Sequence, residues 1–269
     1  HALPLPLGET MVARALLAQA GVARPAGSIA LARGEHLANG GLRCALVRSG
    51  QVAAAVLVQM GTEWRLLNTA DAQGAAQALA LDAALTWTAV QVQAAPAVEV
   101  NGALDVRTLQ AAVVAAQMAG ALSSVFQRSL QYANERQQFG RPIGKFQAIQ
   151  HQLAVMSEHV FAARMAAQLG CSAGHDGMGV VPDRLRVATA KARCSEAALV
   201  VSELAHAIHG AIGFTEEYDL QLFTRRLHAW RQTAGSEAYW YGVAGEALLH
   251  HQGMTLDIVR RITDVDTVL

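Results

Sequence analysis

The sequence predicts an α+β fold that is mainly α, with a small β-domain followed by a four-helix bundle. Residues 28–100 contain brief apolar or alternating runs separated by Gly, Asn and Asp, a pattern typical of strands joined by turns. After residue 103, apolar residues recur at helical spacing in long segments interrupted by Gly and Pro. We therefore expect a short helical part at 1–27, the β-domain at 28–102 and the bundle at 103–269.

The first expected element is a short helix at residues 8–21. Met11, Ala15 and Leu16 share helical spacing there, and Gly21 provides a stop. A sheet of about four to six strands should follow. Its strands are expected in the runs SIALA (28–32), LRCALV (42–47), VAAAVLVQM (52–60), EWRLL (63–67) and WTAVQVQ (87–93).

The bundle is expected to contain four long helices. Small alanines let helices approach closely, so the run AAVVAAQMAGAL at 111–122 predicts a buried bundle helix. A further helix is predicted at 145–169, where Leu153, Met156 and Val160 lie near one face. The same apolar spacing predicts a helix at 183–209.

The junction between two of these helices, YANERQQFGRPIGKFQAIQH at 132–151, can be explained by capping alone. Phe139 is expected to end one helix, Gly140 to follow it in the left-handed conformation, and Pro142 to prevent continuation. A new helix should begin near Lys145.

The same junction also has the chemistry of a binding site. Arg136 precedes the expected stop by one turn, and Gln147 and Gln150 fall in the first turns of the next helix. Arg suits bidentate phosphate contact, and an aromatic neighbour such as Phe139 can pack on a ring system. From the residues alone, a phosphate-bearing ligand and simple capping both remain open.

Composition and cysteine usage argue against several classes of protein. The chain has 21 basic and 21 acidic side chains, so no net field attracts nucleic acid or anionic lipid. Cys44, Cys171 and Cys194 are far apart and form no CxxC pair, which predicts a reducing, cytoplasmic compartment without disulfides or a zinc site. The Glu-x-x-His unit at Glu203 and His206 occurs once, so no metal is expected.

The chain shows no positively charged segment leading into an apolar signal core. Its most hydrophobic windows are Ala-rich and interrupted by Gln, Ser or Arg before the ~20 residues that a spanning helix needs. No membrane span and no nucleic-acid partner are therefore expected.

A second motif follows at residues 207–240, AIHGAIGFTEEYDLQLFTRRLHAWRQTAGSEAYW. The glycines at 210 and 213 leave room for a bulky ligand against the backbone, although a Gly-rich turn between helices would look similar. Taken together, YANERQQFGRPIGKFQAIQHQLA and HGAIGFTEEYDLQLFTRRL resemble the C-terminal helical domain of the acyl-CoA dehydrogenase family. The resemblance is strong over about residues 103–250 and weaker over 1–100.

The resemblance implies a helical N-terminal domain, a middle β-domain and a C-terminal four-helix bundle that mediates dimer and tetramer contacts. Residues 1–27 look like the tail end of that N-terminal domain, of which most is absent here, and the β region at 28–102 is short by family standards. The expected assembly is a homodimer or homotetramer, or a hetero-oligomer with a catalytic family subunit.

The cofactor implied by the resemblance is FAD, held across a subunit boundary. Arg136 would meet the pyrophosphate, Phe139 would pack near the adenine-ribose end, and Gln147 would hydrogen-bond the same moiety. The implied cofactor-binding turn passes close to the phosphates and comprises Gly210, Ala211 and Gly213. Two departures from the family pattern stand here, Ala207 in place of Gln and Ala211 in place of a second glycine.

The implied reaction is α,β-dehydrogenation of an acyl-CoA thioester, in lipid or fatty acid metabolism. A carboxylate removes the α proton while the β hydrogen leaves as hydride to the flavin, and an electron-transfer flavoprotein receives the electrons. The usual Glu position is occupied by Ala234, and an alternative position near the start of the first bundle helix is occupied by Gln110. Neither side chain can accept the proton.

Two other carboxylates lie near these positions. Glu237 is about one helical turn beyond Ala234, and Asp105 precedes Gln110. Glu237 is the better candidate base of the two. Both are better explained structurally, Glu237 as a first-turn acid that stabilises a helix N-terminus and Asp105 as an N-cap or solvated loop residue. Two functions therefore remain open, an active FAD-dependent acyl-CoA dehydrogenase and a non-catalytic subunit that shares the flavin site of a hetero-oligomer.

Overall fold

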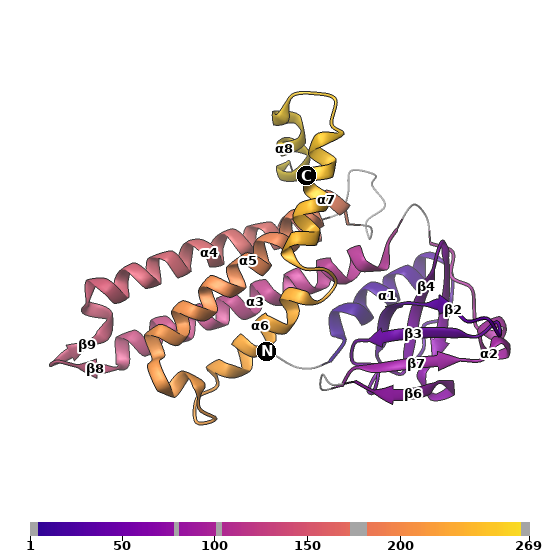
Figure 1. Cartoon of the computed structure of the whole chain (residues 1–269), viewed down its shortest axis with the longest axis horizontal. Coiled ribbons are helices and arrows are strands. Elements are labelled where there is room, and N and C mark those ends of the chain that lie inside the picture. Colours follow the sequence, from indigo (N-terminus) through magenta and orange to yellow (C-terminus); the bar gives the residue numbers. More distant parts are fainter. Residues whose placement is uncertain (1–4, 78–80, 101–103, 173–181, 265–269) are drawn as a thin grey trace. The chain divides into compact units, whose positions relative to one another are not determined.

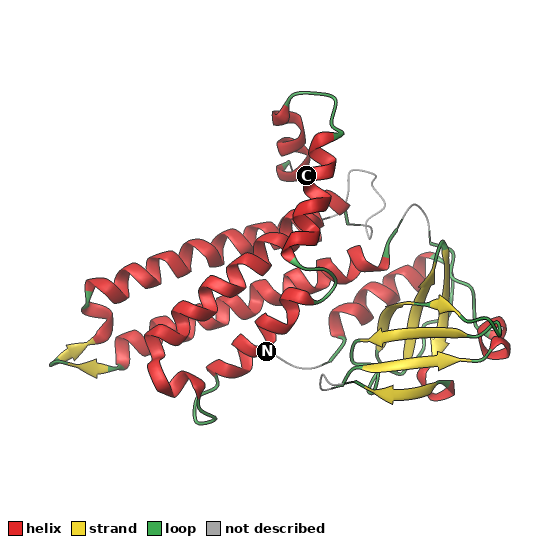
Figure 2. Ribbon diagram, viewed as in Figure 1, coloured by secondary structure: helices red, strands yellow, loops and turns green. Residues whose placement is uncertain are grey.

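The structure is a computed structural model that describes residues 5–77, 81–100, 104–172 and 182–264. Its fold is α+β and mainly α, as the sequence predicts (Figures 1 and 2). The helices are α1 (Leu7–Gln19), α2 (Ala89–Ala94), α3 (Val106–Glu135), α4 (Gln147–Cys171), α5 (Arg184–His209), α6 (Leu220–Gln232), α7 (Glu237–Leu249) and α8 (Thr255–Thr263). The strands are β1 (Ile29–Arg33), β2 (Glu35–His36), β3 (Leu42–Val47), β4 (Ala55–Met60), β5 (Glu63–Asn68), β6 (Gln73–Ala76), β7 (Ala83–Trp87), β8 (Gln137–Gln138) and β9 (Arg141–Pro142).

The chain divides into two compact units between Gln110 and Ala111, within α3. One unit holds α1, α2 and the strands β1 to β7, and the other holds the bundle helices. The domain limits proposed from the sequence, 27/28 and 102/103, remain a prediction.

The β-containing unit consists of two sheets. In the first sheet β1 pairs parallel with β4, which pairs antiparallel with β5. The second sheet is antiparallel, in the order β2-β3-β7-β6. Figure 2 shows these strands gathered in one body with α1 alongside them.

Both faces of the first sheet are buried, which explains why β1 and β4 are almost continuously apolar. Side chains alternate across a strand, so Ala30 and Val56 face the second sheet whereas Leu31 and Leu57 face α1. The α1 side of this core contains Leu16 among others, all nearly fully buried.

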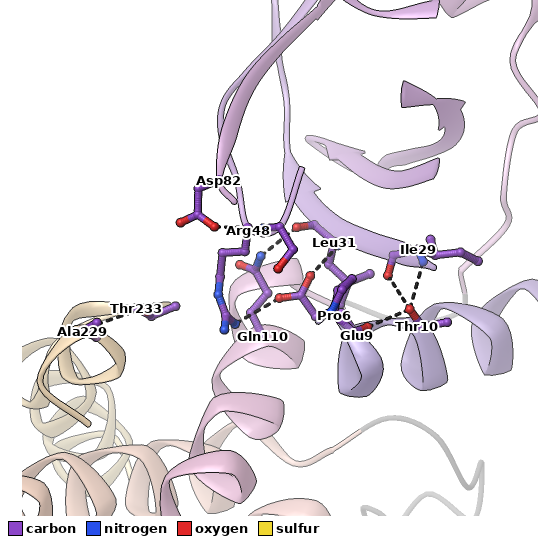
Figure 3. A network of polar contacts seen from close by, with 11 residues as sticks. Pro6, Glu9, Thr10, Ile29, Leu31, Arg48, Asp82, Gln110, Ala229 and Thr233 are labelled. Atoms are coloured by element: carbon purple, nitrogen blue, oxygen red, sulfur yellow. Dashed lines mark hydrogen bonds and ion pairs between the residues drawn. The ribbon is translucent and has the colours of Figure 1, made fainter. Parts of the chain in front are cut away.

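The free edge of β1 is closed by side chains from the helices. Thr10 accepts a hydrogen bond from the Ile29 N–H (2.9 Å), and the Glu9 carboxylate accepts one from the Leu31 N–H (2.8 Å; Figure 3). The Gln110 amide donates to the Leu31 carbonyl (2.8 Å). Edge-strand backbone groups that cannot reach water must find such partners.

Glu9 carries a charge into this buried edge. Its carboxylate pairs with Arg48 (3.1 Å) and is almost completely buried. Burial raises the pKa of Glu9, while Arg48 and the Leu31 N–H act in the opposite direction. The ion pair and the backbone hydrogen bond together offset the desolvation of the carboxylate.

The structure corrects part of the predicted β-domain. The run at 87–93 was expected to be a strand but contains the end of β7 and the helix α2. Thr88 and Gln91 form a capping box there, and this local hydrogen bonding outweighs the alternating pattern. Seven strands occur between residues 28 and 100 of the described chain, more than the four to six expected, because the short strands β2 and β6 carry no apolar run.

The bundle unit has the helices that its periodicity predicts. The predicted helices at 111–122, 145–169 and 183–209 correspond to α3, α4 and α5, and α6 and α7 complete the packing. Its core contains Met118 from α3, Met156 from α4, Val201 from α5 and Leu227 from α6.

Two bundle segments, Val106–Glu135 and Arg184–Phe214, are long and apolar enough to cross a bilayer by length and composition alone. The sequence analysis expected every apolar segment to be interrupted before it is long enough to span a bilayer, and by length and composition this expectation is wrong for these two segments. In α3, 61% of the apolar window is buried, and in the second segment 44% is buried. Core helices of helical bundles have this composition because they are apolar on several faces.

We predict that Glu9→Ala destabilises the protein by about 2–4 kcal/mol, because it leaves the Leu31 N–H and the Arg48 guanidinium without their buried partner. Urea unfolding followed by circular dichroism measures the change. Glu63→Ala on the exposed end of β5 is the matched control and should change stability by less than about 0.5 kcal/mol. Equal effects of the two substitutions would contradict the assigned role of Glu9.

Candidate functional site

The predicted junction at 132–151 forms a β-hairpin rather than a helix end. α3 stops at Glu135, and β8 and β9 flank a two-residue turn. Both turn residues have positive φ, 51° at Phe139 and 78° at Gly140, as a type I′ turn requires. The prediction that Phe139 ends a helix is wrong, because the ladder between β8 and β9 replaces helical bonding. Gly140 is left-handed as expected, although in a hairpin.

The hairpin displays aromatic and cationic groups at its tip. Phe139 is 91% exposed, and its ring meets the Phe146 ring edge-on at 6.2 Å. The Arg141 guanidinium lies 4.2 Å from the centre of the Phe146 ring. A non-glycine residue at positive φ is uncommon, and here it projects an aromatic ring into solvent.

Arg136 and Gln147 are both exposed near this hairpin. The Arg136 backbone carbonyl accepts a hydrogen bond from the Ile143 N–H (2.9 Å), which ties the end of α3 to the segment before α4. Within the described residues, the Arg136 guanidinium forms no hydrogen bond or ion pair. It is therefore available to an anion from outside.

The Gly-rich motif forms a short 3₁₀ segment, Gly210–Phe214, directly after α5. Gly210 ends α5 with φ of 63°. Gly213 is tightly enclosed, since an added Cβ would lie 3.1 Å from the His206 ring and 3.2 Å from Leu220. Ala211 is exposed beside them.

An aromatic cluster brings the two predicted binding segments to the same end of the bundle. Tyr132, one turn before Arg136, stacks on His209 with ring centres 4.4 Å apart, and His209 directly precedes Gly210. Tyr218 packs on both rings. Figure 1 shows the β8–β9 hairpin and the connection from α5 to α6 at one end of the long helices.

Burial lowers the pKa of His209 and also that of His206, whose ring stacks on Phe214. His209 donates from Nδ1 to the Ala205 carbonyl (2.7 Å), and its Nε2 is buried without a hydrogen-bond partner among the described residues. Arg128 and Asp219 form a bidentate ion pair nearby, with a shortest contact of 2.7 Å. The Arg128 hydrogen bond holds the pKa of Asp219 below its usual value.

Ala234, which the resemblance aligns with the base position, lies in the α6–α7 turn, which we define as Arg231–Glu237. Ala234 has φ of 57° and Gly235 has φ of 106°. The Ala234 carbonyl accepts a hydrogen bond from the Trp240 indole N–H (3.0 Å), and Ser236 caps α7. The structure thus presents a well-defined turn whose side chain at 234 is a methyl group.

Glu237, the candidate base, is paired with Arg231. Burial opposes ionisation of Glu237, but the hydrogen bonds from its backbone N–H and from Arg231 prevail and lower its pKa. A carboxylate with a lowered pKa is a weaker proton acceptor. Glu237 therefore behaves as the first-turn acid of α7 rather than as a free base.

Gln110, which the resemblance aligns with the alternative base position, lies in the β-containing unit and takes part in its hydrogen bonding. The Gln110 amide is bonded to the Leu31 carbonyl. The Asp105 carboxylate accepts from the Thr108 N–H (3.3 Å), as an N-cap of α3 would.

Sequence reasoning missed two components of this region. One is the stacking of Tyr132 on His209, and the other is Lys191, a fully buried lysine whose ammonium bonds to the α6–α7 turn. A lysine flanked by alanines on the predicted core face of a helix was the available signal for the second. Among the described residues, no group of three or more His, Cys, Asp or Glu side chains could hold a metal ion.

Comparison with known proteins shows which family the chain belongs to. The family model described as acyl-CoA dehydrogenase, C-terminal domain, matches residues 101–249. The acyl-CoA dehydrogenase IpdE2 of Mycolicibacterium smegmatis is 37% identical over 125 residues, which cover 46% of this chain and 38% of that protein. The chain thus spans well under two thirds of the length of the curated relatives it matches.

Solved structures share the fold. The ChsE4-ChsE5 complex from Mycobacterium tuberculosis contains a chain with a TM-score of 0.78 and 23% identity, which covers 93% of this chain and 77% of that one. A glutaryl-CoA dehydrogenase from Mycobacterium smegmatis in complex with FADH2 has a TM-score of 0.62 and 15% identity, with coverage of 85% and 67%.

We predict that stability falls as the pH drops below about 6.5, the ordinary value for His. Because the folded-state pKa values of His206 and His209 are lowered, their contribution is fully present above the unfolded value and is lost as pH falls toward the folded value. The free energy of unfolding should change by at most about 1.4 kcal/mol per pH unit for each histidine. Urea midpoints at pH 7.5 and 5.5 measure it.

His209→Phe keeps a ring beside Tyr132 but cannot take a proton, so its midpoint should depend less on pH than that of the parent protein. His151→Asn, on the exposed face of α4, is the control and should keep the parent slope. An unchanged slope in His209→Phe would show that His209 is not the titrating group.

Proposed function

Because the chain belongs to the acyl-CoA dehydrogenase family, we propose that it is an FAD-binding subunit of such an enzyme that shares a flavin site with a catalytic partner. The observation that carries this proposal is the chemistry of the side chains at residues 234 and 110, the two expected base positions, and at Glu237, the better of the two candidate carboxylates. Residue 234 is an alanine, Gln110 is an amide bonded to Leu31, and Glu237 is paired with Arg231. None of these side chains is a free carboxylate.

The residues at the hairpin end of the bundle fit the adenosine diphosphate part of FAD. The Arg136 guanidinium has no partner within the described residues, which suits the pyrophosphate. The exposed Phe139 ring would pack near the adenine-ribose end, and Gln147 would hydrogen-bond the same moiety. The turn that contains Gly210, Ala211 and Gly213 would pass close to the phosphates. When bound, FAD supplies the hydride acceptor of the reaction.

The proposed reaction of the assembly is α,β-dehydrogenation of an acyl-CoA thioester, an oxidoreductase activity on a CH-CH donor in lipid metabolism. A carboxylate must remove the α proton as the β hydrogen leaves as hydride. We propose that this carboxylate comes from a second, Glu-bearing family chain in a cytoplasmic hetero-oligomer. An electron-transfer flavoprotein would accept the electrons.

The second candidate function is a self-sufficient dehydrogenase, as a homodimer or homotetramer, with Glu237 as its base. Glu237 lies three residues beyond Ala234 in the first turn of α7, and one of its carboxylate oxygens is buried with no hydrogen-bond partner in the part of the chain that the structure describes. It would have to leave Arg231 to act. The pairing with Arg231 makes this function the less favoured of the two.

We predict that the purified protein binds FAD and that no acyl-CoA thioester bleaches this flavin under anaerobic conditions. Ala234→Glu should confer bleaching, because it places a carboxylate in a turn that is already formed. Visible absorption during titration with a panel of thioesters measures this. Ala238→Glu adds a carboxylate on the exposed side of α7 and should confer nothing.

Bleaching of the unmodified protein would favour the self-sufficient enzyme instead. In that case Glu237→Gln should abolish the reaction, since an amide cannot accept the proton. Bleaching that begins only after a Glu-bearing family subunit is added would support the shared site.

We predict that Arg136→Ala weakens FAD binding by about 10–100-fold, the effect of losing a hydrogen bond to a charged group. Fluorescence titration of the apoprotein with FAD measures the dissociation constant. Arg164→Ala on the exposed face of α4 removes the same charge elsewhere and should bind FAD as the parent does. Parent-like binding by Arg136→Ala would remove Arg136 from the site.

A further inference from the structure

Lys191 occupies the interior of the bundle unit, where a charged side chain is rare. It lies on α5 and has no exposed surface. An ammonium group is costly to bury, so its surroundings must provide strong acceptors. α5 packs against both α6 and α7. The Lys191 side chain hydrogen-bonds to the connection between α6 and α7.

The Lys191 ammonium bonds to both ends of one short backbone segment. It donates to the Arg231 carbonyl (3.0 Å) and to the Gly235 carbonyl (2.9 Å), and a further bond reaches the Ser195 hydroxyl (2.8 Å). An ammonium has three donors, which is enough for a hydrogen bond to each of these three acceptors. Because the two carbonyls are four residues apart, their shared donor fixes the distance between them.

The Arg231 carbonyl belongs to the last turn of α6, where helix carbonyls lack intrahelical partners and carry partial negative charge. The Lys191 charge therefore also stabilises the C-terminus of α6. Its field extends to Glu237 at the start of α7, where it contributes to keeping the carboxylate ionised.

Between the two anchored carbonyls lies Ala234, whose left-handed φ of 57° is unfavourable for a residue with a Cβ. Such a conformation persists only when its surroundings enforce it. Lys191 holds the residues on either side, and the Trp240 indole holds the Ala234 carbonyl itself. A side chain at Gly235 would be strained at φ of 106°, and its Cβ would lie 2.8 Å from the Trp240 indole nitrogen, so a substitution would force the Trp240 ring or the turn to shift.

We propose that Lys191 is the positioning residue of the α6–α7 turn, where its bonds to the Arg231 and Gly235 carbonyls fix the backbone of Ala234. The inference deepens the proposed function and rests on it only for the identification of residue 234 as the base position. The bracing of the turn needs neither flavin nor thioester. A carboxylate placed at residue 234 depends on Lys191 for its orientation.

The first test uses the unmodified protein. The sequence contains two lysines, Lys191 and the exposed Lys145, so the second is an internal control. With ¹⁵N-lysine and ¹³C-carbonyl labelling, the Lys191 ammonium should exchange slowly with water and show couplings through its hydrogen bonds to the Arg231 and Gly235 carbonyl carbons. Equally fast exchange of both ammonium groups would overturn the proposal, whether or not any variant folds.

The second test separates positioning from general stabilisation. Lys191→Met keeps the apolar stem without the ammonium and should shift the NMR resonance of the Trp240 indole N–H, assigned by Trp240→Phe. Cys194→Ala is the control, because the Cys194 thiol bonds to the Ala115 and Ala163 carbonyls rather than to the turn. The Trp240 resonance should stay in place in that variant. An unchanged Trp240 resonance in folded Lys191→Met would overturn the proposal.

The third test links the turn to chemistry. In the Ala234→Glu background, Lys191→Met should reduce the rate of flavin reduction by about 10–100-fold with little change in the apparent affinity for thioester, since a small misplacement of a reacting group costs this much. Unchanged reduction by the double variant would contradict the positioning role. If Ala234→Glu itself reduces no flavin, the identification of residue 234 as the base position fails, whereas the two spectroscopic tests still decide the role of Lys191.

Discussion

The close approach of α4 and α5 is the constraint on which the bundle unit depends. A Cβ added to Gly170 would lie 2.6 Å from the Ala190 Cβ, so these helices pack nearly backbone to backbone. Alanines on α3 and α5 extend this narrow spacing along the core. This packing fixes α5, which carries both candidate regions. Lys191 bonds to the α6–α7 turn, and His209 directly precedes the Gly-rich turn at the C-terminal end of α5.

The helical part of the fold was predictable because its signal is long-range periodicity, which tertiary contacts reinforce. The strands were predictable where both sheet faces are buried, as in β1 and β4, and failed where a local capping box at Thr88 competed with an alternating pattern. The junction at Phe139 failed for a related reason. Gly and Pro indicate a stop, but whether the chain then turns as a helix cap or as a hairpin depends on backbone pairing.

The candidate site was predictable only as a set of residue types. The sequence indicated Arg136, Phe139 and the glycines, but not the stacking of Tyr132 on His209 that brings them to one end of the bundle. Nor could the sequence indicate that Glu237 forms an ion pair with Arg231. That pair forms across a turn in which Ala234 and Gly235 have left-handed backbone conformations. Glu9 and Lys191 show a shared principle, in which a buried charge is stabilised partly by backbone dipoles of a neighbouring element.

The turn around Ala234 has a consequence for the evolution of this chain. Every alanine codon is one base away from a codon for aspartate or glutamate, so a single nucleotide change at residue 234 gives a carboxylate. The features that would present that carboxylate, the buried ammonium of Lys191, the Trp240 indole and the enclosed Gly235, are all intact. These contacts are made by Lys191, Trp240 and the backbone rather than by the side chain at residue 234, so the shape of the turn does not depend on which residue stands there.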